Sequence, residues 1–169
     1  MQTHASPRDT FAVLRRARRH GDPKAANLFI RGTAGGGCEV GLIDFQWCGF
    51  GLAATDVCHH LCAAADAVVL EQSETSLLDH YHAELVTALV ASGAAADAAD
   101  AAARVLPRST LQAQYEAALL DMGRLVFAYQ ITRANFGVAA LNRNAYNKEL
   151  SSAVWLAKRV DGLLAARGL

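Results

Sequence analysis

Residues 20–27 of this chain read His20-Gly21-Asp22-Pro23-Lys24-Ala25-Ala26-Asn27. The glycine and the proline favour a turn. Within this turn a histidine, a carboxylate and an amide stand at the spacing H-x-D-x4-N. A carboxylate can accept a proton, and a side-chain amide oxygen can bind a hard cation. The stretch therefore carries the first indication of chemistry, and the rest of the fold is interpreted around it.

A second acidic motif, Ile43-Asp44-Phe45-Gln46, ends the apolar run Val40 to Phe45. An earlier apolar run, residues 28–30, and the glycine-rich segment 32–37 precede it, which predicts a β-hairpin. The glycine cluster does not read as a phosphate loop, because no Gly-Lys-Ser/Thr follows it. We expect the hairpin to bring Asp22, Asn27 and Asp44 to one of its ends.

These three residue types suit the transfer of a phosphoryl group. The oxygens between the β- and γ-phosphates of ATP carry negative charge, which hard Mg²⁺ ions neutralise through oxygen ligands. The Asp44 carboxylate and the Asn27 amide oxygen are such ligands. A separate carboxylate, Asp22, would orient the acceptor hydroxyl and take its proton.

The same motifs carry a resemblance. The spacing from His20 to Asn27 is that of a kinase catalytic loop, and Asp44-Phe45-Gln46 stands where kinases place D-F-G. With Gly21 between the histidine and the aspartate, the chain resembles the aminoglycoside phosphotransferase and choline kinase superfamily. The resemblance is nearest to the ecdysteroid-kinase-like, or CHK-kinase-like, branch. It is specific over Arg19 to Leu61 and general beyond that.

The resemblance implies roles for individual residues. Asp22 is the expected catalytic base, and Lys24 is expected to reach the transferred phosphate. Asn27 and Asp44 are the expected metal ligands, with Mg²⁺ as the metal and ATP as the phosphate donor. The acceptor is a small-molecule hydroxyl whose identity the resemblance does not fix, and the adenine-binding residues are not assigned.

Three further residues are expected to support the loop. The resemblance implies that His20 packs beneath it and hydrogen-bonds backbone or the metal-binding aspartate. Gly21 belongs to the same motif. Asp56 stands at the head of a helix, where members of the superfamily brace the loop through its backbone.

The chain beyond about Ala53 is predicted to be helical. Apolar residues recur at a spacing of three to four, most clearly from Leu111 to Tyr129. Ser92-Gly93 and Pro107 separate the helices, and the alanine-rich stretch Ala94 to Ala103 is predicted as a surface helix. The expected fold class is α+β, mainly α: a protein-kinase-like C-terminal lobe, with catalytic loop and hairpin before a helical bundle.

The 169 residues suit a single domain, divided into a helix within 1–19, the loops and hairpin of 20–56, and a helical scaffold over 57–169. No G-x-G-x-x-G occurs and no strand is predicted before His20, so we expect the N-terminal lobe to be absent. The face that would meet it should be exposed and apolar. Two functions stay open: an ATP-dependent small-molecule kinase lobe that works with an N-lobe or partner chain, and a non-catalytic pseudokinase fragment that acts as a binding module.

Composition also bears on the possible partners, the location and metal binding of the chain. Sixteen basic residues balance sixteen acidic ones, which gives no basis for a nucleic-acid partner. The sequence contains no run of 18 apolar residues, so no membrane span is predicted. The first residues also lack a hydrophobic leader, and a cytoplasmic location is therefore expected. Cys58 and Cys62 are interpreted as core residues rather than zinc ligands. Five aromatic residues could line a substrate pocket, although core positions are the commoner reading: Trp47, Tyr115, Tyr129, Phe136 and Trp155.

Overall fold

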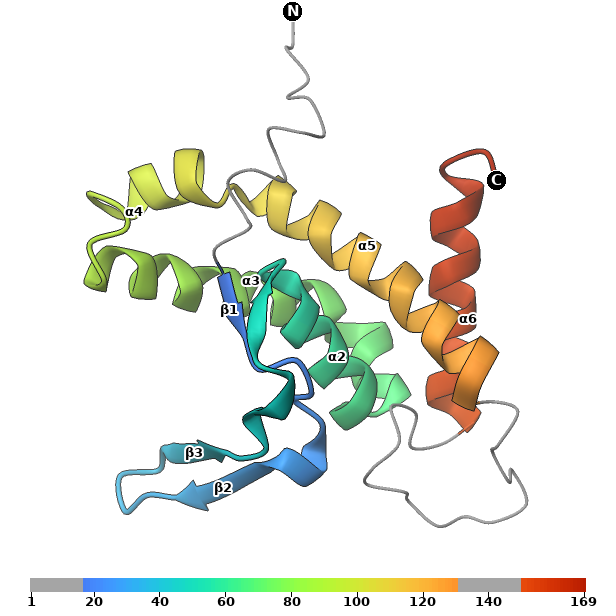
Figure 1. Cartoon of the computed structure of the whole chain (residues 1–169), viewed down its shortest axis with the longest axis horizontal. Coiled ribbons are helices and arrows are strands. Elements are labelled where there is room, and N and C mark those ends of the chain that lie inside the picture. The colour runs from blue at the N-terminus through green and yellow to red at the C-terminus, as the bar shows by residue number, and fades with distance from the viewer. Residues whose placement is uncertain (1–16, 131–149) are drawn as a thin grey trace, which may run out of the picture.

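The computed structural model of the chain describes residues 17–130 and 150–169, in which short strands pair in twos and helices follow them (Figure 1). The strands are β1 (Ala17–Arg19), β2 (Leu28–Gly32), β3 (Cys38–Leu42) and β4 (Gly49–Gly51). The α-helices are α2 (Ala54–Ala64), α3 (Ala67–Ala91), α4 (Ala98–Asp100), α5 (Arg108–Leu125) and α6 (Leu150–Ala165). Short 3-10 or π turns cover Ala25–Asn27, Phe45–Trp47, Ala101–Val105 and Val126–Gln130. The predicted mainly α, α+β class is confirmed for these residues.

The prediction of a helix within residues 1–19 is wrong for its last three residues. Ala17–Arg19 form β1, which pairs antiparallel with β4 so that Ala17 lies opposite Gly51. A strand therefore does precede His20, contrary to the sequence-based expectation, while residues 1–16 lie outside the described part. The pairing joins segments far apart in the chain, and such non-local contacts override local helix propensity.

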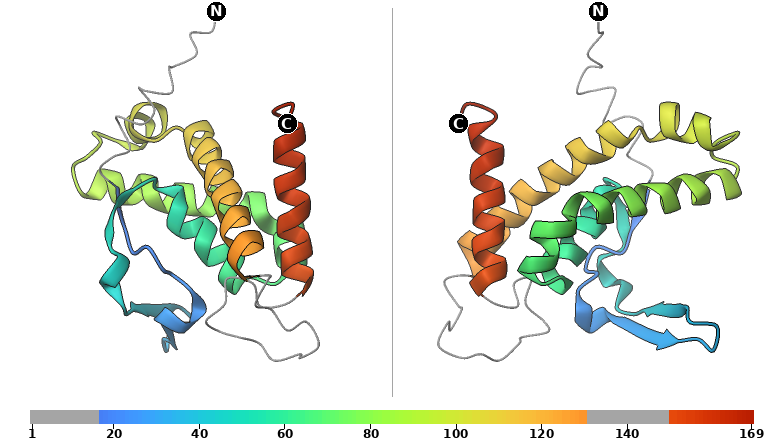
Figure 2. Two further views of the ribbon diagram at one scale, coloured as in Figure 1. Left: turned by 45° about the vertical axis from the view of Figure 1, so that its right-hand side comes forward. Right: turned by 180° about the vertical axis from the view of Figure 1, so that it is seen from behind.

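The predicted β-hairpin is confirmed as β2 and β3. The two strands are antiparallel, with Leu28 opposite Leu42 and Gly32 opposite Cys38. The turn between them closes through a hydrogen bond from the Thr33 N–H to the Gly37 carbonyl at 2.9 Å. Both views in Figure 2 show the hairpin extending away from the helices.

One face of this hairpin is apolar and exposed. Directly opposed residues of an antiparallel pair share a face, so Leu28 and Leu42 lie on the same side as Ile30 and Val40. The exposed fractions of Ile30 and Val40 are 71% and 55%. The hairpin therefore presents an exposed apolar face next to the loop that carries Asp22.

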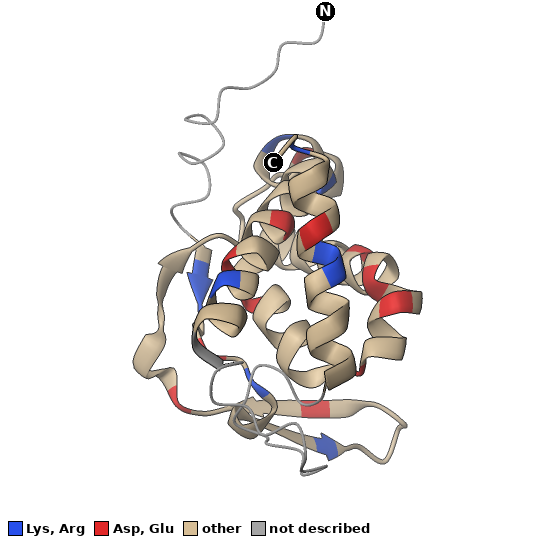
Figure 3. Cartoon of the chain, turned by 90° about the vertical axis from the view of Figure 1, so that its right-hand side faces the viewer, with Lys and Arg blue, Asp and Glu red and all other residues tan. Residues whose placement is uncertain are grey.

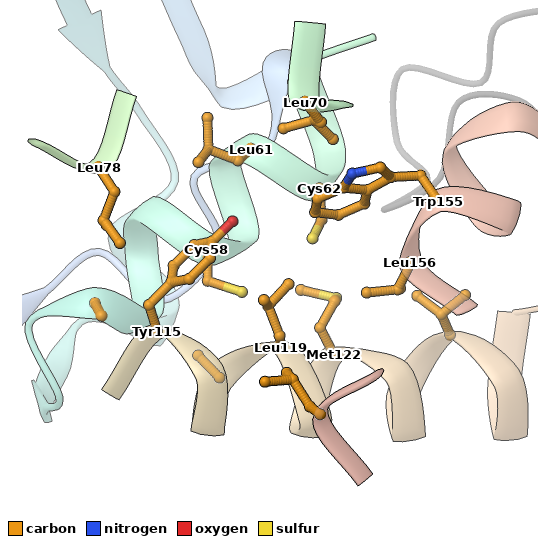
Figure 4. Packing of buried hydrophobic residues seen from close by; sticks show 14 of the residues in the cluster. Cys58, Leu61, Cys62, Leu70, Leu78, Tyr115, Leu119, Met122, Trp155 and Leu156 are labelled. Atoms are coloured by element: carbon orange, nitrogen blue, oxygen red, sulfur yellow. The ribbon is translucent and has the colours of Figure 1, made fainter. Parts of the chain in front are cut away.

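The main core lies where α2, α3, α5 and α6 meet (Figure 4). The predicted apolar stripe of α5 is buried, and its central residues have no exposed surface. The largest fully buried side chains are Tyr115, Leu70, Leu78, Leu111, Leu119, Met122, Leu156, Val126 and Cys58. Since each such side chain stabilises the fold by roughly 1.5–3 kcal/mol when buried, packing rather than propensity holds these helices.

Helices α5 and α6 approach closely at Gly123. A Cβ placed on this glycine would lie 2.7 Å from Cγ2 of Val160 and 3.4 Å from Cε2 of Phe127. Because Gly123 has no side chain, α6 can pack closely against α5 at this point.

The predicted helix breaks are observed, but the alanine-rich segment differs from the prediction. α3 ends at Ala91, Gly93 has a φ of 73°, and Pro107 is the N-cap of α5. Between them α4 continues directly into the π turn Ala101–Val105, so the predicted helix is observed from Ala98 onward and most of its residues are exposed or half-buried. Residues 94–97 are not helical, and Ala95 and Ala101 are buried with Val86 in a small second cluster.

Figure 3 shows basic and acidic residues interspersed over the helices. Among residues 17–130 and 150–169, none of the helices combines the length and apolar character needed to span a bilayer.

Candidate functional site

The loop that carries Asp22 is attached by its backbone to the first turn of α2. The Asp56 carboxylate accepts a hydrogen bond from the His20 N–H at 2.5 Å and another from the Gly21 N–H at 3.0 Å. Asp56 is also placed where the positive end of the α2 dipole favours a carboxylate. One side chain therefore fixes the two peptide groups that lead into Asp22.

His20 links this loop to the residue before Asp44. Its Nδ1 accepts a hydrogen bond from the Asp22 N–H at 3.3 Å, so Nε2 carries the ring proton and donates to the Ile43 carbonyl at 2.8 Å. The ring is buried and lies 4.8 Å from the Phe45 ring, centroid to centroid. His20 thus bonds the backbone preceding Asp44 rather than the Asp44 side chain.

Asn27 connects Asp22 to the hairpin. Its Nδ2 donates to the Asp22 carbonyl at 2.9 Å and to Asp22 Oδ2 at 3.2 Å. The backbone carbonyl of Asn27 accepts a hydrogen bond from the Ile43 N–H at 3.1 Å. Since both side-chain hydrogen bonds use Nδ2, Oδ1 is the atom of this buried amide that would bind a cation.

Lys24 forms an ion pair with Asp22 through its Nζ and Asp22 Oδ2. The Lys24 side chain is 20% exposed and that of Asp22 is 6% exposed, so the pair lies at the edge of the buried loop. The ammonium group is therefore positioned next to the carboxylate and can still reach solvent.

Asp44 occupies an unusual backbone conformation at the open end of the hairpin. Its φ and ψ are 64° and 60°, and it is the non-glycine residue of the described part with a positive φ. Such left-handed residues cost of order 1 kcal/mol or more and gather at functional sites, and Asp tolerates the conformation better than most side chains. Asp44 is solvent-exposed, whereas Asp22 and Asn27 are buried.

Gly21 is required by both its conformation and its surroundings. Its φ is 89°, and a Cβ at this position would lie 2.3 Å from the Trp47 carbonyl oxygen. The loop and the segment after Asp44 therefore touch through backbone, which leaves no room for a side chain.

Two neighbouring histidines of α2 also contact this region. The ring of His60 donates from Nδ1 to the Pro23 carbonyl at 3.0 Å. His59 lies close enough to Arg19, Asp56 and Asp22 to interact with their charges. Burial lowers the pKa of His59 below the usual 6.5, although the carboxylates of Asp56 and Asp22 oppose that change. The sequence analysis gave His60 no role; its spacing of four from Asp56, which puts both residues on one helix face, was the available signal.

The N-terminus of α2 is itself held by the helices behind it. The Tyr81 hydroxyl donates to the Ala53 carbonyl at 2.9 Å, and the Ala54 N–H donates to Oε1 of the buried Gln114 at 3.4 Å. Thus α3 and α5 fix the start of α2, which in turn holds the loop that carries Asp22. This is how the helical scaffold acts on the site.

The donor set at the open end of the hairpin suits magnesium. A carboxylate at Asp44 and an amide oxygen at Asn27 are hard oxygen donors, and Mg²⁺ in proteins typically takes one or two such ligands with water and phosphate oxygens completing an octahedron. In the described residues no group of three or more His, Cys, Asp and Glu side chains is arranged to hold a metal by itself. The residues present therefore fit a metal bound jointly with a phosphate.

The remaining sequence candidates lie elsewhere. Cys58 and Cys62 are buried in the core, where their mutual hydrogen bond and then burial raise the pKa of the Cys58 thiol. Tyr115 and Trp155 are core residues as well, and burial raises the pKa of Tyr115. Trp47 is 65% exposed next to Gly21. The Tyr129 side chain and Phe136 lie outside the described residues.

Comparison with known families gives one match. The model of the ecdysteroid kinase-like family matches residues 1–93, which is more than half of the 169-residue chain and includes every residue assigned to the site. Comparisons with curated proteins and with solved structures gave no significant match. The family is one of kinase-like phosphotransferases, in agreement with the resemblance that the loop motifs carry. The chain belongs to the ecdysteroid kinase-like family.

Proposed function

We propose that this chain provides the catalytic, C-terminal lobe of an ATP-dependent phosphotransferase that acts on a small-molecule hydroxyl. Asp22 serves as the catalytic base and Lys24 meets the transferred phosphate. Asn27 and Asp44 hold the magnesium that accompanies ATP. His20, Gly21 and Asp56 keep the loop in shape, and a second lobe or partner chain covers the nucleotide.

The reaction follows from these roles. The acceptor hydroxyl gives its proton to Asp22 while its oxygen forms a bond to the γ-phosphorus, and the bond to the bridging oxygen breaks so that ADP leaves. A bound Mg²⁺ supplies charge neutralisation on the phosphate oxygens. Lys24, adjacent to Asp22, adds a positive charge on the acceptor side. Positioning and electrostatics supply most of the rate in such transfers, so the rigidity of the loop is the main requirement.

The observation that carries the proposal is the double role of Asn27. The side-chain Nδ2 of Asn27 donates to both the backbone carbonyl and the carboxylate of Asp22. The backbone carbonyl of Asn27 accepts from the N–H of Ile43, the residue before Asp44. Asn27 thereby links the proposed base to the backbone next to Asp44, the other proposed cation ligand. A chance occurrence of the motif would not require these hydrogen bonds.

Calorimetric titration of the chain with ATP, with and without Mg²⁺, tests the metal half of the site. We expect binding that requires Mg²⁺ and that Asp44→Asn removes. Asn is chosen because it tolerates the left-handed conformation of Asp44, so the variant removes charge without adding backbone strain. The matched control is Glu39→Gln, which removes a charge from the exposed far part of the same hairpin.

Equal ATP affinity in wild type and Asp44→Asn, or binding that is indifferent to Mg²⁺, contradicts the assignment of Asp44. Loss of binding in Glu39→Gln as well would point to overall charge rather than to a site. Asp22→Asn should leave this binding intact and abolish transfer once an acceptor is supplied. Turnover in that variant would remove Asp22 as the base.

A second candidate, a non-catalytic binding module, is favoured by one observation. The hairpin presents Ile30, Val40 and Leu42 at exposed fractions of 71%, 55% and 42% on one face. Exposed apolar patches of this kind mark interaction surfaces. Absence of Mg²⁺-dependent nucleotide binding in a folded chain would favour this function over the first. A cytoplasmic location belongs to either proposal.

A further inference from the structure

Asp22 lies between two attachments that come from a single face of α2. Asp56 accepts from the N–H groups of His20 and Gly21, on the N-terminal side of Asp22. His60 donates from Nδ1 to the Pro23 carbonyl, on the C-terminal side. Residues four apart on an α-helix lie one above the other, so the two side chains present an acceptor and a donor in register with the loop.

The chemistry of the two attachments is complementary. A carboxylate only accepts, which suits the N–H groups before Asp22. Pro23 has no N–H, and its residue is buried, so its carbonyl is the group that needs a partner. A histidine that donates from Nδ1 meets this requirement, whereas an apolar side chain at position 60 would leave the carbonyl without a hydrogen bond.

We propose that His60 is a positioning residue for the catalytic loop: it fixes the peptide after Asp22 as Asp56 fixes the peptides before it. This inference rests on the proposed function, because what it positions is the proposed base. His60 itself touches neither base nor metal ligand through any hydrogen bond of the described residues; it acts through the Pro23 backbone.

The hydrogen bond to Pro23 also determines which ring nitrogen of His60 must carry a proton. Donation to a carbonyl requires the proton on Nδ1, while His20, which accepts at Nδ1, must carry its proton on Nε2. The two histidines of the site thus differ at Nδ1, which carries a proton in His60 and accepts a hydrogen bond in His20. The assignment does not depend on whether the chain is active.

The test uses the full chain, labelled with ¹⁵N, and three forms of residue 60. Long-range ¹H–¹⁵N spectra of wild type should show His60 protonated at Nδ1. His60→Phe keeps a ring and removes the donor, so the amide resonances of Gly21, Asp22 and Lys24 should shift. His60→Asn, whose amide nitrogen stands near the Nδ1 position, should restore them towards wild type. Far-UV circular dichroism confirms that each variant is folded, and His60→Leu, which also lacks a donor, replaces His60→Phe if the latter does not fold.

Turnover supplies the second readout. With Mg²⁺, ATP and an accepted hydroxyl substrate, His60→Phe should lower kcat by roughly 10- to 100-fold, the loss typical of a misplaced catalytic group. KM for ATP should stay within about twofold, because Asn27 and Asp44 are untouched. His60→Asn should recover most of kcat.

The possible failures are distinct. A His60 ring without a proton on Nδ1, or unchanged loop resonances in the folded His60→Phe or His60→Leu variant, overturns the positioning role whatever the activity. Equal kcat in wild type and His60→Phe does the same. A wild-type chain that shows the Nδ1 tautomer and the loop shifts but never transfers phosphate, even with a covering lobe supplied, supports the attachment and overturns the proposed function.

Discussion

The amide of Asn27 donates to two oxygens of Asp22, the backbone carbonyl at 2.9 Å and the carboxylate Oδ2 at 3.2 Å. Both residues are buried, with exposed fractions of 5% and 4%. A side chain that would bind a metal through one atom therefore shapes the proposed base through the other. Substitution of Asn27 should affect stability as well as chemistry.

Asn27→Ala should lower the free energy of unfolding by about 1–3 kcal/mol, because it leaves the buried Asp22 carbonyl without its partner. Denaturant titration followed by circular dichroism measures this change. Gln72→Ala, at an exposed position of α3, is the matched control and should stay within about 0.5 kcal/mol. An Asn27→Ala variant as stable as the control would mean that the hydrogen bonds do not hold the loop.

Asp56→Ala should destabilise the chain by roughly 2–3 kcal/mol, since it removes a charged acceptor shared by two backbone N–H groups. Hydrogen exchange should report the loss locally, with the Gly21 amide losing its protection. Asp121→Ala serves as the control, because Asp121 forms an exposed ion pair with Arg124. Unaltered exchange at Gly21 would show that the Asp56 contact contributes little.

Gly21→Ala should be more damaging than the same change at Gly36. Both glycines have a positive φ, 89° and 81° respectively, but a Cβ at Gly21 meets the Trp47 carbonyl at 2.3 Å while Gly36 has nothing within 4 Å. Gly36→Ala thus measures the conformational cost alone, about 1–2 kcal/mol. The excess loss of stability in Gly21→Ala reports the backbone contact, and equal losses would contradict that contact.

The buried His59 predicts a pH dependence of stability. Because burial lowers the pKa of His59 in the folded chain below the 6.5 of an exposed imidazole, the folded state binds fewer protons than the unfolded state. The contribution of His59 is then fully present above about pH 6.5 and is lost as the pH falls towards and through the lowered pKa. The slope is at most about 1.4 kcal/mol per pH unit.

Free energies of unfolding at pH 7.5, 6.5 and 5.5 check this sign. Wild type should lose more stability over this range than His59→Gln does, and the exposed His80→Gln should behave like wild type. A wild type whose stability rises towards pH 5.5 relative to His59→Gln would mean that the charged imidazole is stabilised instead.

Local patterns in the sequence predicted some segments of the fold and missed others. The hairpin, the break after α3 and the buried stripe of α5 follow from local periodicity and turn residues, and each is observed. β1 was not predicted, because its partner β4 lies far along the chain and pairing outweighs local propensity. The spacing of four residues puts Asp56 and His60 on one helix face, but the contact of His60 with Pro23 also depends on how α2 meets the loop, which local patterns do not contain.

The hydrogen bonds described around Asp22 all come from residues between His20 and His60. In the part of the chain that the structure describes, these hydrogen bonds therefore lie within one continuous stretch of sequence, and α3 and α5 support it through the start of α2. A change that moves α2 would displace the loop on both sides of Asp22 at once, because α2 carries both Asp56 and His60.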